Sequence, residues 1–344
     1  MKNKKYLMIA VVAFSTLLSS FAFYGYQMVY AANFNVEKED SFFYIPTGAT
    51  FKDVQNLVNK KEIVGNLVAF SFLAKLMDYD KSVKPGRYLI KKDMNNLEAI
   101  RMLRSGDQKP TRISFVAAKK VQDLAKPISE NIELTEAEIS EFLNDSSRMV
   151  AYGFKPETYI SMFIPNTYEV YWTTDGNQLM DKLKKEYDKF WTKERQAKAD
   201  SMKMTREEVS TLAAIVQAET AQSDEKPTVA GVYINRLRKG IALQADPTLI
   251  FAANDFGIKR VLNKHKEIDS PYNTYKYKGL PPGPIRMPNI TSLDAVLNYE
   301  EHSYIYFCAK EDFSGYHNFA VTYSDHRKNA RKYQKALNAK KIFK

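Results

Sequence analysis

Residues 205–220 read TREEVSTLAAIVQAET and have the features of a helix that carries its own start signal. Thr205 and Glu208 have the spacing of a capping box, in which each side chain satisfies a free backbone N–H of the first turn. Two more segments follow, VYINRLRKGIALQADPT at 232–248 and YNTYKYKGLPPGPI at 272–285. The three segments together predict two helices followed by loops rich in proline and glycine.

One side of the first expected helix is apolar until it reaches a carboxylate. Four residues share this side, at steps of three, four and three: Val209, Leu212, Val216 and Glu219. Such steps keep residues on the same side of a 3.6-residue repeat. If Glu219 is buried, desolvation favours its protonated form, which can donate a proton to a leaving-group oxygen. The alternative, favoured by the pattern alone, is that Glu219 turns into solvent at the helix end.

The order and spacing of several motifs resemble those of one protein family. AIVQAET, VYINRLRKGIALQADPT, YNTY and GLPPGPI follow one another as in the MltG (YceG-like) endolytic murein transglycosylases. The match runs on to HNFAVTYSDH at 317–326 and extends back, more weakly, to PNTY at 165–168 and PGRY at 85–88. In this family the Glu of the Glu-Thr pair is the catalytic acid, so the resemblance implies that role for Glu219.

The same resemblance implies a set of substrate-binding residues within the matched motifs. They are Gln217, Asn235, Arg236, Gln244, Asp246, Thr248, Tyr272, Asn273, Thr274 and His317. From the residues alone, Arg236 either points its guanidinium into a cleft or forms a surface ion pair. Residues 244–248 are expected as an extended loop, because a residue before proline avoids the helical region. In that loop Asp246 is expected to shape the site and not to act as a nucleophile.

The segment GLPPGPI at 279–285 has two interpretations. Its three prolines and two glycines make a rigid loop that either lines a sugar groove or forms a structural turn. The resemblance to the family favours the groove.

Composition excludes several classes of site. The chain has 344 residues, a formal net charge of +11, four histidines and a single cysteine, Cys308. One cysteine rules out an internal disulfide or a cysteine-rich metal site, and the histidines lack a spacing such as HExxH. We therefore expect no metal and no organic cofactor. The positive charge indicates an acidic partner.

The N-terminal region predicts a membrane anchor. The apolar run at 6–30 exceeds the roughly 20 residues needed to span a bilayer. It is also longer than the h-region of a cleaved signal peptide, about 7–15 residues, although Ala31-Ala32 would suit cleavage. Lysines within 2–5 and acids within 37–40 place the N-terminus in the cytoplasm and the remaining chain outside it. An extracytoplasmic location in the cell (inner) membrane excludes nucleic acid as the partner.

The fold class predicted is α+β, with a small domain before the catalytic one. After a cytoplasmic tail at 1–5 and the transmembrane helix at 6–30, a strand–helix–strand–helix pattern occupies 41–108. The resemblance implies a LysM-like domain there, for which glycan binding and a spacer role are both open. It also implies a mixed α+β catalytic domain at 109–344.

The function implied by the resemblance is that of a membrane-anchored lytic transglycosylase. Such an enzyme cleaves the β-1,4 bond between N-acetylmuramic acid and N-acetylglucosamine in nascent peptidoglycan, leaves 1,6-anhydro ends and terminates strand elongation. Peptidoglycan synthases are candidate partners. Two alternatives remain: a lysozyme-type hydrolase that uses Asp246 or Asp224 as a second carboxylate, and a non-catalytic glycan-binding scaffold.

Overall fold

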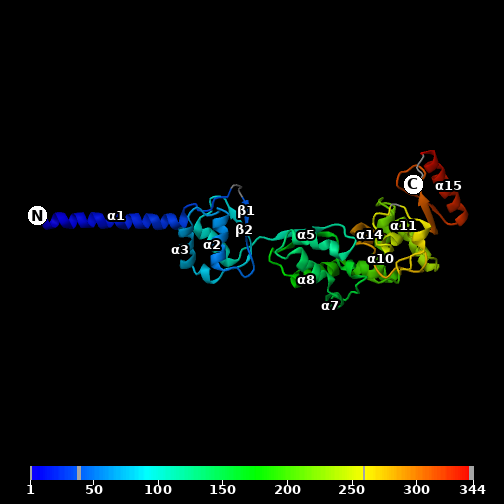
Figure 1. The fold of residues 1–344 in the computed structure, drawn as a ribbon, viewed down its shortest axis with the longest axis horizontal. Helices are drawn as coiled ribbons and strands as arrows, with labels where there is room; N and C mark the ends of the chain where they lie inside the picture. Colours follow the sequence, from blue (N-terminus) through cyan, green and yellow to red (C-terminus); the bar gives the residue numbers. More distant parts are fainter. Residues whose placement is uncertain (1, 37–39, 259, 341–344) are drawn as a thin grey trace. The chain divides into compact units, whose positions relative to one another are not determined.

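The computed structural model describes residues 2–36, 40–258 and 260–340 (Figure 1). The chain forms two compact units. The first unit comprises Met1–Arg112, Asn131–Leu134 and Glu169–Asp175. The second unit comprises Ile113–Glu130, Thr135–Tyr168 and Gly176–Lys344. Two short segments from beyond residue 112 therefore belong to the first unit. Glu37 and Glu39, which entered the prediction of membrane orientation, lie outside the described residues.

The first unit begins with α1 (Lys2–Tyr30), the one described helix that is long and apolar enough to cross a membrane. Its apolar side chains are exposed over most of its length, as a bilayer-facing surface requires. At its C-terminal end the Asn96 amide donates a hydrogen bond of 2.8 Å to the Met28 carbonyl. The helix is thereby joined directly to the folded part of this unit.

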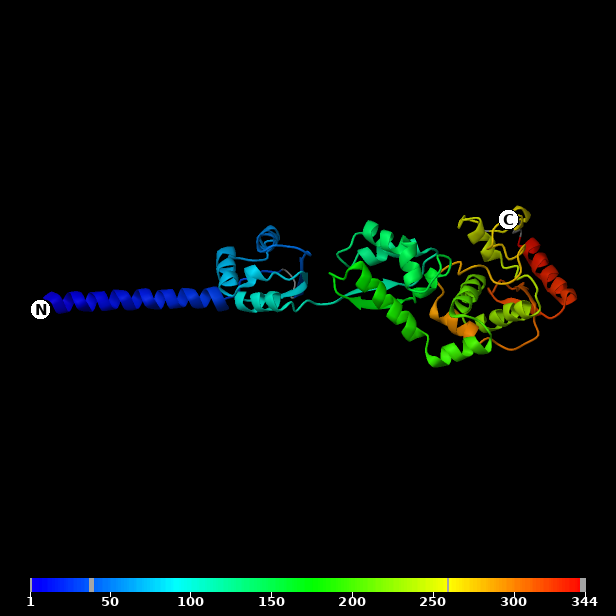
Figure 2. The same ribbon diagram turned by 90° about the horizontal axis from the view of Figure 1, so that it is seen from below.

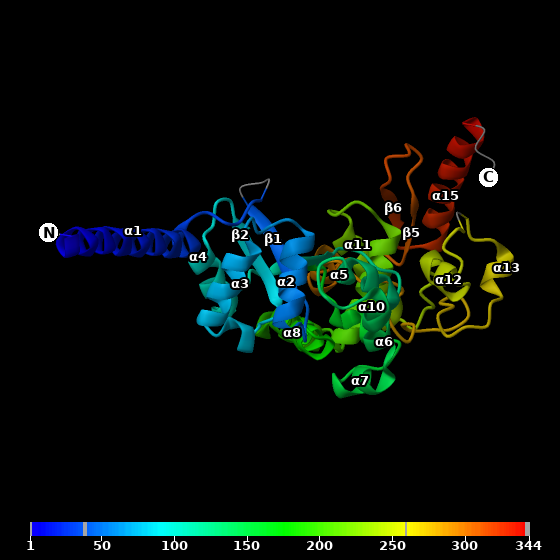
Figure 3. The same ribbon diagram turned by 60° about the vertical axis from the view of Figure 1, so that its left-hand side comes forward.

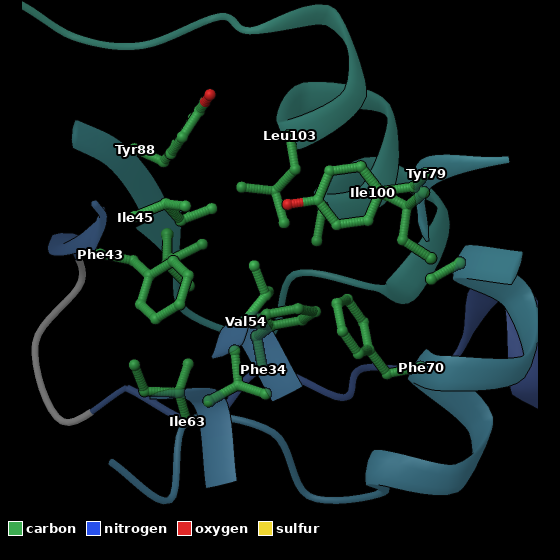
Figure 4. Close-up of a cluster of buried hydrophobic side chains, with 14 of the residues drawn as sticks. Phe34, Phe43, Ile45, Val54, Ile63, Phe70, Tyr79, Tyr88, Ile100 and Leu103 are labelled. Atoms are coloured by element: carbon green, nitrogen blue, oxygen red, sulfur yellow. The ribbon is translucent and has the colours of Figure 1, made fainter. Parts of the chain in front are cut away.

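The remaining first unit packs helices against a two-stranded antiparallel sheet. Its elements are β1 (Asp40–Ile45), α2 (Phe51–Lys60), α3 (Leu67–Leu76), the 3-10 turn η1 (Tyr79–Lys81), β2 (Gly86–Lys91) and α4 (Asn96–Ser105). β1 pairs with β2 so that Phe43 lies opposite Tyr88. Alternate strand residues face one core, together with the apolar sides of the helices (Figure 4). The side chains labelled there are Phe34, Phe43, Ile45, Val54, Ile63, Phe70, Tyr79, Tyr88, Ile100 and Leu103.

The second unit is mostly helical. Its helices are α5 (Ala125–Ser129), α6 (Glu136–Asn144), α7 (Ser146–Ala151), α8 (Gly176–Phe190), α9 (Lys193–Ser201), α10 (Arg206–Glu219), α11 (Lys226–Arg238), α12 (Asp246–Ala252), α13 (Asn263–Lys266), α14 (Ile290–Leu297) and α15 (Tyr323–Ala339). Two 3-10 turns, η2 (Val121–Leu124) and η3 (Tyr159–Met162), accompany them. Most of β3 (Thr111–Phe115) and of β4 (Asn166–Val170) also belongs to this unit, and the two strands pair with each other. β5 (Tyr306–Ala309) pairs antiparallel with β6 (His317–Ala320). The structure is thus mixed α+β, as predicted.

Helix α10 is the centre of the second unit. The predicted capping box is present: Glu208 N donates to Thr205 Oγ1 at 3.1 Å, and Thr205 N donates to Glu208 Oε2 at 2.8 Å. Residues 209–216 are all buried, because α11, α12 and α14 contact this helix. Figure 2 shows the orange α14 beside it, and Figure 3 shows the β5–β6 hairpin next to α15. The C-terminal end of α10 therefore meets several elements at once.

One local expectation is wrong. Residues 244–248 were expected to be extended throughout, but α12 begins at Asp246, with Pro247 in its first turn. A proline is tolerated there because the N–H groups of the first turn have no intrahelical partner. Only the part of this segment before Asp246 is a loop.

Candidate active site

A cavity of about 340 Å³ lies at the C-terminal end of α10. Four residues expected from the sequence line it: Glu219, Arg236, Gln244 and Asp246. They come from α10, α11, the loop after α11 and the start of α12. The fold thus brings together four polar side chains from two of the quoted motifs, at 205–220 and 232–248.

Glu219 is the last residue of α10 and is half-buried, with part of its surface on the cavity. The hydroxyl of Tyr233, a buried residue of α11, donates a hydrogen bond of 2.7 Å to Glu219 Oε1. Burial raises the pKa of Glu219 from 4.5 to about 7; the hydrogen bond from Tyr233 opposes the rise, and the charge of Asp246 adds to it. Of the two alternatives left by the sequence, the desolvated carboxyl is the one observed.

Asp246 lies at the rim of the cavity as the first residue of α12. The hydroxyl of Tyr275 donates a hydrogen bond of 2.5 Å to Asp246 Oδ1. The pKa of Tyr275 is well above its usual range, first because of burial and then because of this bond and the nearby negative charge. Tyr275 thus remains a neutral donor that holds the Asp246 carboxylate in place.

Arg236 lines the cavity, but its guanidinium donates hydrogen bonds to other groups of the protein. Nε donates to the Ala242 carbonyl at 2.9 Å, one terminal nitrogen donates to the Ile305 carbonyl at 3.0 Å, and the other donates to Gln244 Oε1 at 2.7 Å. Burial lowers the pKa of Arg236. Its observed role is to join α11, the loop at 242–244 and the segment before β5, which is neither of the two roles expected from the sequence.

Three further expected residues lie beneath the loop and do not line the cavity. Thr248 Oγ1 donates to the Ala245 carbonyl at 2.7 Å and lies 2.8 Å from Thr274 Oγ1, which accepts from Ala245 N at 3.0 Å. The Asn273 amide donates to two backbone carbonyls, at 2.9 and 2.8 Å. All three side chains are buried. Thr248 and Thr274 hold the backbone that presents Gln244 and Asp246, and Asn273 holds the backbone at 266–268.

Gln217 and Asn235 are on other faces of their helices. A step of two residues turns an α-helix by about 200°, so Gln217 faces away from Glu219, and Asn235 faces away from Tyr233. Gln217 Oε1 accepts from Asn289 N at 2.6 Å. The Asn235 amide donates to the carbonyls of residues 302 and 304, at 2.7 and 3.0 Å.

His317 and Tyr272 are also placed outside the cavity lining. His317 Nδ1 lies 2.7 Å from Glu225 Oε2, an oxygen that also accepts from the Thr220 hydroxyl at 3.0 Å. This buried pair joins β6 to the residue that follows Glu219. The ring of Tyr272 packs on Phe251 with centroids 4.6 Å apart.

Most of the cavity wall consists of aromatic residues that the sequence did not single out as site residues. They are Tyr233, Tyr275, Tyr306, Phe307, Tyr323 and His326. The rings of Tyr306 and His326 stack with centroids 5.2 Å apart. Aromatic side chains belong to the core more often than to a functional site, so their presence alone does not indicate a site. The only sequence signal for His326 was the family match at 317–326. Tyr233 had no signal of its own, because it belongs to the buried apolar side of its helix.

The loop at 279–285 forms no part of the cavity wall. Four of its residues are buried, and a Cβ on Gly283 would lie 1.9 Å from the Glu157 carbonyl oxygen. The structural turn is therefore the interpretation that fits the observed packing. Within the described residues, no group of three or more His, Cys, Asp or Glu side chains gathers as a metal site would require.

Comparison with known proteins shows which family the chain is similar to. The sequence model of the YceG-like family matches residues 43–332. An endolytic murein transglycosylase of Streptococcus pneumoniae is 24% identical over an alignment of 360 positions, which covers 94% of this chain and 64% of that protein. This chain therefore spans less than two thirds of the length of the pneumococcal relative.

Two further proteins match over most of their length. An endolytic murein transglycosylase of Bacillus subtilis is 26% identical over 313 residues, 86% of this chain and 85% of that protein. The crystal structure of a yceG-like protein from Listeria monocytogenes superposes with a TM-score of 0.55 at 27% identity, and covers 85% of this chain and 99% of that one.

Proposed function

Because the chain belongs to the YceG-like family, we propose that it is a peptidoglycan lytic transglycosylase and that Glu219 is its catalytic acid. The name of its relatives, endolytic murein transglycosylase, supports the reaction class. The observation that carries the assignment of Glu219 is its position on a cavity, with a pKa raised to about 7 by burial. A carboxyl with such a pKa is substantially protonated at neutral pH, as a general acid must be.

The first step would be proton transfer from Glu219 to the glycosidic oxygen. The bond between that oxygen and C1 of N-acetylmuramic acid breaks, and N-acetylglucosamine leaves with the proton as its 4-hydroxyl group. The hydrogen bond from Tyr233 to Glu219 Oε1 stabilises the carboxylate that this step creates. The acid is thereby converted into a base in the position where the second step needs one.

In the second step the C6 hydroxyl of the same muramic acid residue forms a bond to C1 and closes a 1,6-anhydro ring. Its proton returns to Glu219, which restores the starting state. The attacking hydroxyl belongs to the substrate, so its proximity replaces an activated water and a second catalytic carboxylate. Asp246, held by Tyr275, would place negative charge near the positive charge that develops on the sugar ring.

The proposal has finer features, which the same family membership supports. Helix α1 would anchor the chain in the cell membrane, with the N-terminus in the cytoplasm and the cavity outside, where strands are made. The first unit would be a LysM-like domain. A cavity of about 440 Å³ between the β1–α2 loop and α2, lined by Thr47, Asp53 and Asn56 among others, gives it a place to bind glycan. Peptidoglycan synthases would be partners, since an endolytic cut ends strand growth.

A hydrolase of the lysozyme type is the second candidate, because Asp246 lines the same cavity as Glu219. The deciding experiment is mass spectrometry of uncrosslinked glycan strands incubated with the full chain in detergent. We expect 1,6-anhydro ends with the unaltered protein and no cleavage with Glu219→Gln. Reducing ends would assign the hydrolase. Cleavage by Glu219→Gln at the full rate would refute the role of Glu219, and no cleavage by either protein would favour the glycan-binding scaffold.

A further inference from the structure

A second cavity, of about 280 Å³, lies on the other side of the last turn of α10. Its lining includes Ala118, Lys119, Asp123, Gln217, Arg286 and Met287. Gln217 faces this cavity and Glu219 faces the first one. The two cavities are therefore separated by the thickness of one helix, roughly 10 Å with its side chains.

Arg286 brings an unpaired positive charge to this cavity. Its Nε is buried without a hydrogen-bond partner, and no carboxylate within the described part of the chain forms an ion pair with it. Burial lowers the pKa of Arg286, and no negative charge offsets that effect. A partly desolvated guanidinium is costly unless an anion pairs with it. Arg286 therefore presents to this cavity a partly buried guanidinium that forms no ion pair with the described residues.

Two more donors face the same space. Gln217 uses Oε1 to accept a hydrogen bond from Asn289 N at 2.6 Å, which leaves its Nε2 group as a donor without a partner among the described residues. Lys119 also lines the cavity, with its ammonium 4.4 Å from the centre of the Phe256 ring. Arg286 and Gln217 thus offer donors to a cavity of the right size for a small anionic group, and Lys119 adds a second positive charge to its lining.

The carboxylate of Asp123 does not neutralise this arrangement. Its Oδ2 already accepts hydrogen bonds from Lys119 N at 2.8 Å and Lys120 N at 2.9 Å. The Asp123 carboxylate is therefore already hydrogen-bonded to the backbone of its own loop. With two cationic side chains and one anionic side chain, the lining keeps a net positive charge.

We propose that this cavity binds a carboxylate of the stem peptide attached to the muramic acid residue at the cleaved bond. The proposal rests on the proposed function, since it needs a peptidoglycan strand in the first cavity. Stem peptides are short and carry free carboxylates. Three to five extended residues span about 10–17 Å, which matches the roughly 10 Å thickness of the helix between the cavities. The cavity would then make the enzyme select strands that bear uncapped peptides.

The test measures kcat/KM of the full chain in detergent on three sets of strands. The first set bears stem peptides, the second has had its peptides removed, and the third has its peptide carboxylates converted to amides. The variants are Arg286→Gln, Arg286→Lys and, as a control for the loss of one positive charge, Arg101→Gln on the exposed surface of α4.

We expect Arg286→Gln to lower kcat/KM about tenfold on peptide-bearing strands, the size typical of one hydrogen-bonded charge. Its kcat/KM on the other two sets of strands should equal that of the unaltered protein. Arg286→Lys should recover part of the loss, and Arg101→Gln should match the unaltered protein. The proposal is overturned if Arg286→Gln changes kcat/KM equally on all three sets of strands or on none of them. If the unaltered protein cleaves none of the strands, the proposed function itself fails.

Discussion

Replacing Tyr233 by Phe removes the hydroxyl that donates to Glu219 Oε1 at 2.7 Å and keeps the ring in place. This hydrogen bond stabilises the ionised form of Glu219, so it holds the pKa below the value that burial alone would produce. Its removal should therefore raise the pKa of Glu219 above about 7. More of the acid would then be protonated in alkaline solution.

The size of this shift follows from the strength of the bond. A hydrogen bond to a charged group contributes about 1.5–3 kcal/mol, and one pKa unit corresponds to about 1.4 kcal/mol. The pKa of Glu219 should thus rise by about one to two units. At about pH 6 the acid is mostly protonated in both proteins, whereas at about pH 9 the variant should hold at least roughly ten times more of the acid form.

The assay is kcat/KM for strand cleavage as a function of pH, because this quantity reports ionisations of the free enzyme. The descending limb should move from about pH 7 in the unaltered protein to a value one to two units higher in Tyr233→Phe. Tyr277→Phe, on an exposed tyrosine that bonds only Asp269, is the matched control. A descending limb that stays in place or moves to lower pH in Tyr233→Phe would refute Glu219 as the acid governed by this bond.

Three further predictions concern the same unit. Glu219→Gln should stabilise the fold, relative to the unaltered protein, increasingly as pH rises. The pKa of Glu219 is about 7 in the folded protein against its ordinary value of 4.5, so the unaltered protein loses stability as pH rises from about 4.5 to 7, by up to about 3 kcal/mol. Urea unfolding at about pH 5 and pH 8 measures this, and an equal difference at both would contradict it. Asp246→Asn should move the descending limb of the kcat/KM profile to lower pH, because a negative charge that raises the Glu219 pKa is lost. End-group analysis should still find anhydro products. Complete loss of cleavage would instead indicate that Asp246 is a nucleophile. Gly283→Ala should lower stability by about 3 kcal/mol or more, since its Cβ would meet the Glu157 carbonyl oxygen at 1.9 Å; an unchanged melting temperature would show that this loop can move.

Sequence reasoning worked best where the signal is local. The start of α10 at Thr205 and the amphipathic side that ends in Glu219 were predictable because helix capping and periodicity involve residues only three or four positions apart. The motif match, in contrast, treated all polar residues of a matched block alike. It grouped Gln217 with Glu219, although the helix turns them toward different cavities.

The hydrogen bonds that hold the site together could not be predicted from the sequence, for a physical reason. Thr248 and Thr274 bind each other beneath the loop and do not line the cavity. Arg236 lines the cavity, but its guanidinium is bonded to Gln244 and to backbone carbonyls. Whether a hydroxyl or an amide faces substrate or backbone depends on which partners packing brings within hydrogen-bond distance. Residue type and spacing do not show which of these partners a side chain has.

The sequence by itself determined the class of structure, the apolar N-terminal helix, the central helix and the carboxyl at its end. Those features depend on composition, on apolar length and on contacts within a single helical turn. Only the tertiary structure decided that Glu219 would be desolvated, that Tyr233 would be its hydrogen-bond donor and that His326, from the other end of the domain, would share its cavity. Desolvation and the resulting pKa are collective effects of all the groups that surround a side chain, and those groups meet only when the chain is folded.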